Sequence, residues 1–191
     1  MFFNKAIGAL ALALALIGST KAAPTLIERV TPCTANYRIA ELNGVAPAFS
    51  DQTPGATAKF LQQLPLKPDA HLILYIDGAP GITVAPDAST VRDFALGVRQ
   101  LFYKVYPTSS PASTDYGNGT THTELEIITG VLHTIALPLN IHAGMNFNYD
   151  LADCQIKTIQ GFLTIPSAVG GVPVNRQAVA NELLAAGNAG L

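Results

Sequence analysis

Apolar residues repeat with a helical period in two parts of the chain. Between residues 54 and 64 they form a single stripe, where Thr53 is a suitable N-cap and Pro54 suits the first helical turn. Between residues 89 and 106 they recur at intervals of three and four, at Val91, Phe94, Val98, Leu101, Phe102 and Val105. The pattern predicts a short helix and a long one, the second ending before Pro107.

Four other segments have the composition of strands. Aromatic and branched residues fill 71–77 up to a Gly-Ala-Pro-Gly break, and three longer runs follow a polar loop, at 121–136, 139–149 and 155–165. The short turns between these runs favour antiparallel pairing. A final helix is predicted over 176–186. Because the strands gather after the helices, we expect an α+β fold rather than alternating βαβ units.

The first 22 residues have the features of a secretory signal peptide. Lys5 supplies a positive charge, and the apolar residues 7–17 are too few to span a bilayer as a helix. Small residues at Thr20 and Ala22 then precede a suitable cleavage site. A buried N-terminal helix is the alternative. We expect a secreted, extracellular protein.

We expect the mature chain to begin with an irregular segment at 23–52, followed by one domain at 53–191. Loss of Lys5 and Lys21 with the leader changes the net charge from −2 to about −4. The sequence has no basic run, which argues against nucleic acid and anionic membranes as partners. No segment after the leader is long and apolar enough to cross a membrane as a helix.

The two cysteines, Cys33 and Cys154, form a pair with no third cysteine in the chain. In an oxidising compartment this predicts one disulfide, whose loop of roughly 120 residues corresponds to about 4–5 kcal/mol of stabilisation. Two buried thiols are the alternative. A structural zinc site or a catalytic thiol is not expected from two cysteines, and no metal or cofactor is predicted.

One glycosylation sequon, Asn118-Gly119-Thr120, lies in a segment rich in Ser, Thr, Gly and Pro. Such a segment is typical of an exposed loop, so a glycan on Asn118 is expected if the source is eukaryotic.

Three local patterns, in order along the chain, carry a family resemblance. They are Tyr75-Ile-Asp-Gly-Ala-Pro-Gly81 followed by Val91-Arg-Asp-Phe94, then Gly130-Val-Leu-His133 with His142-Ala-Gly-Met-Asn-Phe147, then Phe147-Asn-Tyr-Asp150 with Gln155-Ile-Lys-Thr-Ile159. Over residues 53–166 this order resembles the NTF2-like superfamily of SnoaL-type and ketosteroid isomerase-like proteins. The resemblance implies a strongly bent antiparallel sheet wrapped around a long helix, which together form a cone with a pocket.

The resemblance also implies a role for Asp77, since the isomerase-like members use an Asp at this point of the strand as general base. A carboxylate at a pocket mouth can move a proton beside a carbonyl. Tyr75 shares its strand face and would donate to an oxyanion. The alternatives are an Asp77 bound to its own turn and a Tyr75 that packs as a wall residue. The family's second acidic residue falls here on Met145.

Two functions follow from this picture. We expect a small apolar molecule to bind in the cone, against Met145, Phe147, Tyr149, Phe94 and Val98. A non-catalytic binding protein is the first hypothesis, favoured by the apolar Met145. A cofactor-free lyase, isomerase or cyclase that uses Asp77 is the second. The motifs of serine hydrolases, zinc proteases, P-loop NTPases and dinucleotide-binding enzymes are absent.

Polar residues of the predicted hairpin have simpler expected roles. His133 and His142 are expected to be a surface or interface pair, and Glu124 and Glu126 to share a solvated strand face with His122.

The predicted hairpin strands also carry apolar residues on both faces. Leu125, Ile127 and Val131 lie on one face, and Ile128 and Leu132 on the other. A single core covers only one face, so we expect a homodimer.

Overall fold

The computed structural model describes residues 32–132 and 135–189. The expected signal peptide at 1–22, the residues that follow it up to 31, and His133 lie outside the described residues. Within the described chain one sheet has the strand order β2-β1-β7-β6-β5-β3, with β4 paired to β5. Its strands are β1 Leu66–Ile76, β2 Ile82–Ala85, β3 Phe102–Pro107, β4 Ser113–Asp115, β5 Thr120–Val131, β6 Ile135–Asp150 and β7 Gln155–Thr164.

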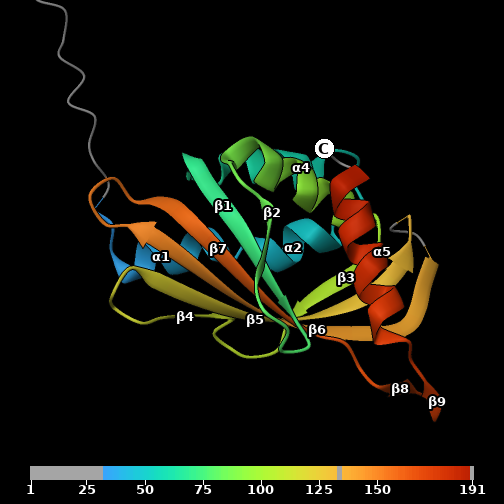
Figure 1. Ribbon diagram of the computed structural model, residues 1–191. Coiled ribbons are helices and arrows are strands. Elements are labelled where there is room, and N and C mark those ends of the chain that lie inside the picture. Colours follow the sequence, from blue (N-terminus) through green and yellow to red (C-terminus); the bar gives the residue numbers. More distant parts are fainter. Residues whose placement is uncertain (1–31, 133–134, 190–191) are drawn as a thin grey trace, which may run out of the picture.

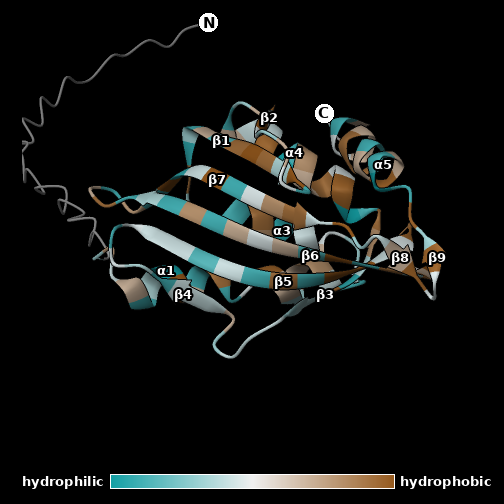
Figure 2. Ribbon diagram, turned by 60° about the horizontal axis from the view of Figure 1, so that its bottom comes forward, coloured by the Kyte–Doolittle hydropathy of each residue, from teal (hydrophilic) through white to brown (hydrophobic). Residues whose placement is uncertain are grey.

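Helices cover one face of this sheet. They are α1 Ala35–Leu42, α2 Val45–Ser50, α3 Ala56–Gln63, α4 Ala88–Arg99 and α5 Arg176–Ala189. Figure 1 shows α4 and α5 beside one another and α1 near β4. In Figure 2 the strands β7, β6 and β5 lie in front, α3 is seen behind them, and α5 lies to their upper right. A small separate hairpin, β8 Ala168–Val169 and β9 Val172–Pro173, precedes α5.

Strand alternation decides which side chains face the helices. In the first part of β5 the buried positions are Thr121, Thr123, Leu125 and Ile127, and the residues between them are only partly buried. The fold is therefore the α+β cone that the resemblance implied, with the core between the sheet and α4. One pairing departs from the expected antiparallel sheet, because β1 and β7 run parallel.

The long predicted helix is in fact a helix followed by a strand. α4 ends at Arg99, and residues 102–107 pair with β5 as the antiparallel strand β3. Phe102 and Val105 fit a helical spacing, but their segment is rich in aromatic and branched residues, which favour a strand. The N-cap of α4 is Asp87, whose carboxylate accepts from the Thr90 amide in a capping box.

The prediction of an irregular segment at 23–52 is wrong for its described part, which forms α1 and α2. The α1 stripe is hard to recognise because it buries Arg38 as well as Leu42. Pro47 lies in the first turn of α2, where its missing N–H is not needed.

The break predicted at residues 137–138 is also wrong, since both residues lie inside β6. The pairing of β5 with β6 shifts between Ile128 and Gly130, opposite Pro138. A proline is tolerated at such an irregularity because no ladder donor is required there.

Candidate binding cavity

An apolar cavity of about 130 Å³ lies between the sheet and the helices. Every side chain that lines it is aliphatic, aromatic or methionine. The walls come from α2, α3, α4 and α5 and from β1, β3, β5, β6 and β7. No titratable side chain of the described residues lines this cavity, so its interior offers shape and apolar contact alone.

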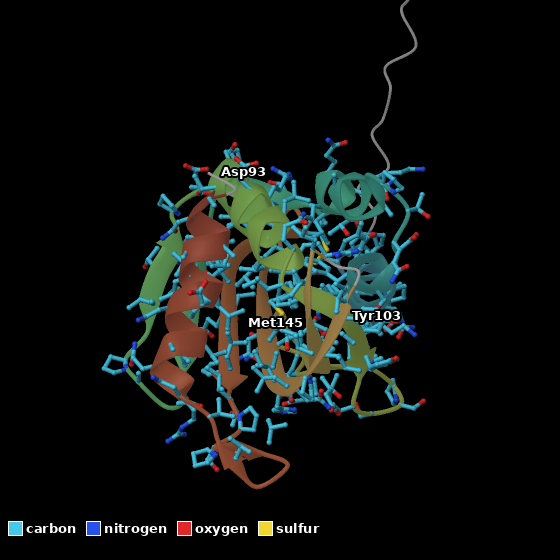
Figure 3. All side chains as sticks on the ribbon, turned by 90° about the vertical axis from the view of Figure 1, so that its right-hand side faces the viewer. Asp93, Tyr103 and Met145 are labelled. Carbon is cyan, nitrogen blue, oxygen red and sulfur yellow. A yellow bond between two sulfur atoms is a disulfide. The ribbon has the colours of Figure 1, made fainter. Side chains whose placement is uncertain are left out.

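Two periodicities place the predicted pocket residues on these walls. The helical repeat of α4 directs Phe94 and Val98 into the cavity, and the strand alternation of β6 directs Met145 and Phe147 into it from the opposite side. Figure 3 shows Met145 near the centre of the molecule, between the helices and the sheet. Four of the five predicted pocket residues therefore meet around one space.

Tyr149, the fifth predicted pocket residue, lies outside the cavity lining. It is 2% exposed, and the guanidinium of Arg38 lies 5.9 Å from its ring centroid. Its hydroxyl has no hydrogen-bond partner among the described residues, and burial raises the pKa of Tyr149. Tyr149 packs beneath α1, an element that the sequence pattern did not predict.

Asp77 ends β1 and joins three elements. Its amide donates to the Leu163 carbonyl at 2.9 Å, and its carboxylate accepts from the Ile165 amide at 2.9 Å. The other carboxylate oxygen lies 3.7 Å from Nη1 of Arg176, at the start of α5. Asp77 borders a separate surface groove between the β1–β2 turn and α5, and it does not line the apolar cavity.

Tyr75 faces the uncovered side of the sheet. The alternation of β1 buries Leu72 and Leu74 and leaves Tyr75 only partly buried. Its ring stacks on Phe162, with centroids 4.8 Å apart and planes inclined by 12°. The structure therefore brings neither Tyr75 nor Asp77 to the cavity that Met145 and Phe147 line.

Arg99 is a buried residue whose role the sequence did not indicate. At the end of α4 it donates to the Asp51 carbonyl at 2.7 Å and to the Thr57 hydroxyl at 3.2 Å. Burial lowers the pKa of Arg99 to about 10, while the Asp51 carboxylate acts in the opposite direction. The helical repeat of α4 extends to position 99, and this spacing was the feature of the sequence that could have indicated a buried Arg99. Arg99 fixes the α2–α3 connection beside the cavity without lining it.

The uncovered sheet face carries a polar cluster. The two oxygens of Glu124 lie 2.5 Å from Nε2 of His122 and 2.6 Å from Nε2 of His142. Gly144 faces Glu124 across the strands, and a Cβ there would lie 3.2 Å from Oε1 of Glu124, so the glycine leaves room for the cluster. Nδ1 of His122 lies 2.6 Å from Oδ1 of Asn146. Within the described ranges, no group of three His, Cys, Asp or Glu side chains is arranged to hold a metal ion.

The two cysteines and the sequon lie where the sequence suggested. Cys33 and Cys154 form a disulfide that joins the start of the described chain to the β6–β7 turn, with Cα atoms 5.0 Å apart. Asn118 is exposed in the β4–β5 turn, where its side-chain oxygen accepts from the Thr120 amide at 3.0 Å. None of the helices in the described part of the chain is long and apolar enough to cross a membrane.

No family model matches the sequence, and a search of curated proteins finds no relative. Solved structures give three representative likenesses. AusH from Aspergillus nidulans is 12% identical, with 75% of this chain and 95% of that chain covered and a TM-score of 0.49. A protein assigned as a SnoaL-like polyketide cyclase from Jannaschia sp. CCS1 is 10% identical, with 78% and 92% covered and a TM-score of 0.47.

The third likeness is to an NTF2-like protein of unknown function from Cytophaga hutchinsonii. It is 13% identical, with 67% of this chain and 95% of that chain covered and a TM-score of 0.38. The function proposed for this chain depends on its own residues.

Proposed function

We propose that this chain is a secreted, non-catalytic protein that binds one small apolar molecule in its cone. The observation that carries the proposal is the cavity of about 130 Å³ with a wholly apolar lining. Apolar cavities of roughly 150 Å³ stay dry and hold a benzene-sized molecule. A ligand of one ring or a short hydrocarbon chain therefore fits this space.

The same lining selects against polar ligands. A hydroxyl buried without a hydrogen-bond partner costs roughly 1–3 kcal/mol, and the cavity walls offer no such partner. A hydrocarbon ring should therefore bind about ten- to a hundredfold more tightly than its hydroxylated analogue, apart from any part of the ligand that reaches solvent.

The alternative is a cofactor-free lyase, isomerase or cyclase with Asp77 as general base. That chemistry requires the Asp77 carboxylate to reach a substrate in the pocket. Its oxygens instead bind the Ile165 amide and lie near Arg176, beside a groove outside the apolar cavity. The position of Asp77 thus favours the binding proposal.

Secretion and glycosylation are further parts of the proposal. The disulfide between Cys33 and Cys154 suits an oxidising compartment, and Asn118 is exposed. The mass of the chain recovered from the medium of a secreting eukaryotic host tests both, because cleavage after Ala22 and a glycan change it by distinct amounts.

The homodimer also remains a prediction. Most outward side chains of β5–β7 are polar, but the β5–β6 hairpin exposes Leu132, Ile135 and Leu137. These apolar side chains supply the surface that a second copy would cover. Light scattering at micromolar concentration measures the oligomeric state.

Ligand binding can be measured with fluorobenzene by ¹⁹F NMR. Ala143 lines the cavity and is 1% exposed, so Ala143→Leu should fill the space and weaken binding at least tenfold. Ala40→Leu, at an exposed position of α1, is the matched control and should bind as the native chain does. Absence of saturable binding by the native chain, or unchanged binding by Ala143→Leu, would overturn the proposal.

A further inference from the structure

The C-terminal helix α5 forms part of the cavity wall with few large side chains. Leu183 lines the cavity, and the other buried residues of α5 are Ala180 and Gly187. Figure 3 shows this helix, coloured red, to the left of the labelled Met145. The fully buried residues of α5 are thus one leucine, one alanine and one glycine, while Val179 and Leu184 pack partly buried against the core.

Two glycines bring α5 directly against α4. A Cβ on Gly97 would lie 2.2 Å from the Ala186 carbonyl oxygen, and a Cβ on Gly187 would lie 2.1 Å from Cε2 of Phe94. The two helices therefore pack closely, because neither glycine has a side chain at the contact. Because Phe94 lines the cavity, separation of α5 from α4 uncovers a cavity wall.

One ion pair holds the start of α5 to the sheet. The Asp77 carboxylate is fixed by the Ile165 amide, and its second oxygen lies 3.7 Å from Nη1 of Arg176. The Arg176 side chain is 51% exposed, so solvent screens this contact. The contact is thus suited to frequent opening and closing.

The connection to α5 allows movement without breaking the main sheet. α5 follows the short β8–β9 hairpin, whose turn contains Gly170 at φ 56° and Gly171 at φ 84°. The hairpin pairs only with itself, and α5 donates to no strand of the main sheet by the backbone. The helix and hairpin can therefore move together.

We propose that α5 is the gate of the cavity. Release of Arg176 from Asp77 lets α5 move off α4, and Leu183 leaves the cavity wall so that a small apolar molecule enters or departs. The kind of molecule that enters past α5 rests on the proposed function, whereas the movement of α5 does not depend on it. Asp77 thereby acts as a positioning residue for α5.

Thiol labelling tests the gate without any ligand. The native cysteines are joined in the disulfide, so Leu183→Cys introduces a single thiol. Ile156→Cys places a thiol at a buried position of β7, away from the cavity lining, which reports global unfolding. Under native conditions, methyl methanethiosulfonate should label Leu183→Cys at least tenfold faster than Ile156→Cys, after each rate is corrected for the variant's global stability.

Adding Arg176→Gln should speed the labelling of Leu183→Cys about two- to fivefold, the range of an exposed ion pair. The matched control is Lys67→Gln, which removes a solvent-accessible contact with Asp150 and should leave the Leu183→Cys rate unchanged. Equal corrected rates for Leu183→Cys and Ile156→Cys, or no effect of Arg176→Gln, would overturn the gate.

Hydrogen exchange gives a second measurement if a cysteine variant does not fold. In the native chain the α5 amides should exchange faster than those of β6, and Arg176→Gln should accelerate α5 alone. Equal exchange of α5 and β6 contradicts the gate. Fluorobenzene binding separates the two proposals, because a chain that opens at α5 but binds no probe retains the gate and loses the proposed function.

Discussion

Two buried arginines fix the N-terminal helices of the cone. Arg38 donates to both carboxylate oxygens of Asp115 at 2.8 Å, and Arg99 donates to the Asp51 carbonyl and the Thr57 hydroxyl. At the sequence level such residues resemble solvated ones, because the partner of Arg38 lies 77 positions away. By contrast, the faces that Phe94, Val98, Met145 and Phe147 occupy could be predicted, since local spacing decides which side of a helix or strand a residue lies on.

The Arg38–Asp115 pair predicts a pH dependence of stability. The hydrogen bond from Arg38 lowers the pKa of Asp115 from 3.8 to about 2. A carboxylate with a lower pKa in the folded state stabilises the fold above its ordinary pKa and loses that effect as pH falls through the folded pKa. The contribution of Asp115 should therefore be complete above about pH 5 and be lost progressively toward pH 2.

Urea denaturation of the native chain and of Asp115→Asn measures this contribution. Asp115→Asn leaves Arg38 buried without its counter-charge, which should cost about 3–5 kcal/mol at neutral pH. Between about pH 5 and pH 2 the native chain should lose roughly 2 kcal/mol more than the variant, so the two curves converge. Asp69→Asn, at an exposed position, is the control. Parallel curves for the native chain and Asp115→Asn would contradict this role for Asp115.

At the scale of elements, sequence patterns located most strands and the last helix but mistook some of their limits. α5 begins at Arg176, as predicted, and the Asn175 side chain accepts from the Ala178 amide. The boundary between α4 and β3 was missed because Phe102 and Val105 satisfy both a helical and a strand assignment. Only pairing with β5, a contact between distant segments, decides between them.

The contact between α4 and α5 predicts an unusual response to alanine. In an exposed helix interior, Gly→Ala stabilises by up to about 1 kcal/mol. At Gly97 the new Cβ would instead meet the Ala186 carbonyl oxygen at 2.2 Å, so Gly97→Ala should lower the free energy of unfolding by about 1–3 kcal/mol. Ser89→Ala, on the exposed side of α4, should change it by less than about 0.5 kcal/mol. A stabilised Gly97→Ala variant would show that the helices do not pack this closely.

At the scale of the whole molecule, the order of elements indicated an α+β fold, and the family resemblance implied the cone. The position of Asp77 was not predictable to the same extent, because the end of a strand can face either the cavity or its rim. Its contacts with Ile165 and Arg176 depend on how β7 and α5 close around the end of β1. Likewise, Tyr149 packs beneath α1 and therefore lies outside the cavity. The sequence has no apolar stripe that would predict α1.

The disulfide ties the start of α1 to the β6–β7 turn of the sheet. Cys33 precedes α1 and Cys154 follows β6, with a sequence separation of 121. Replacing both with serine should lower the free energy of unfolding by about 2–5 kcal/mol, chiefly through the gain in unfolded-chain entropy. Urea denaturation of the double variant checks this, with the reduced native chain for comparison. Stability equal to that of the oxidised native chain would contradict a stabilising role for the bridge.

The most direct test of the binding proposal is a crystal structure of the protein grown with bromobenzene, with the bromine located by anomalous scattering. The proposal predicts one principal bromine peak among Phe94, Val98, Met145 and Phe147 in the native chain, and none there in Ala143→Leu. A cavity without bromine at saturating probe, or a principal peak in the groove beside Asp77, would contradict it.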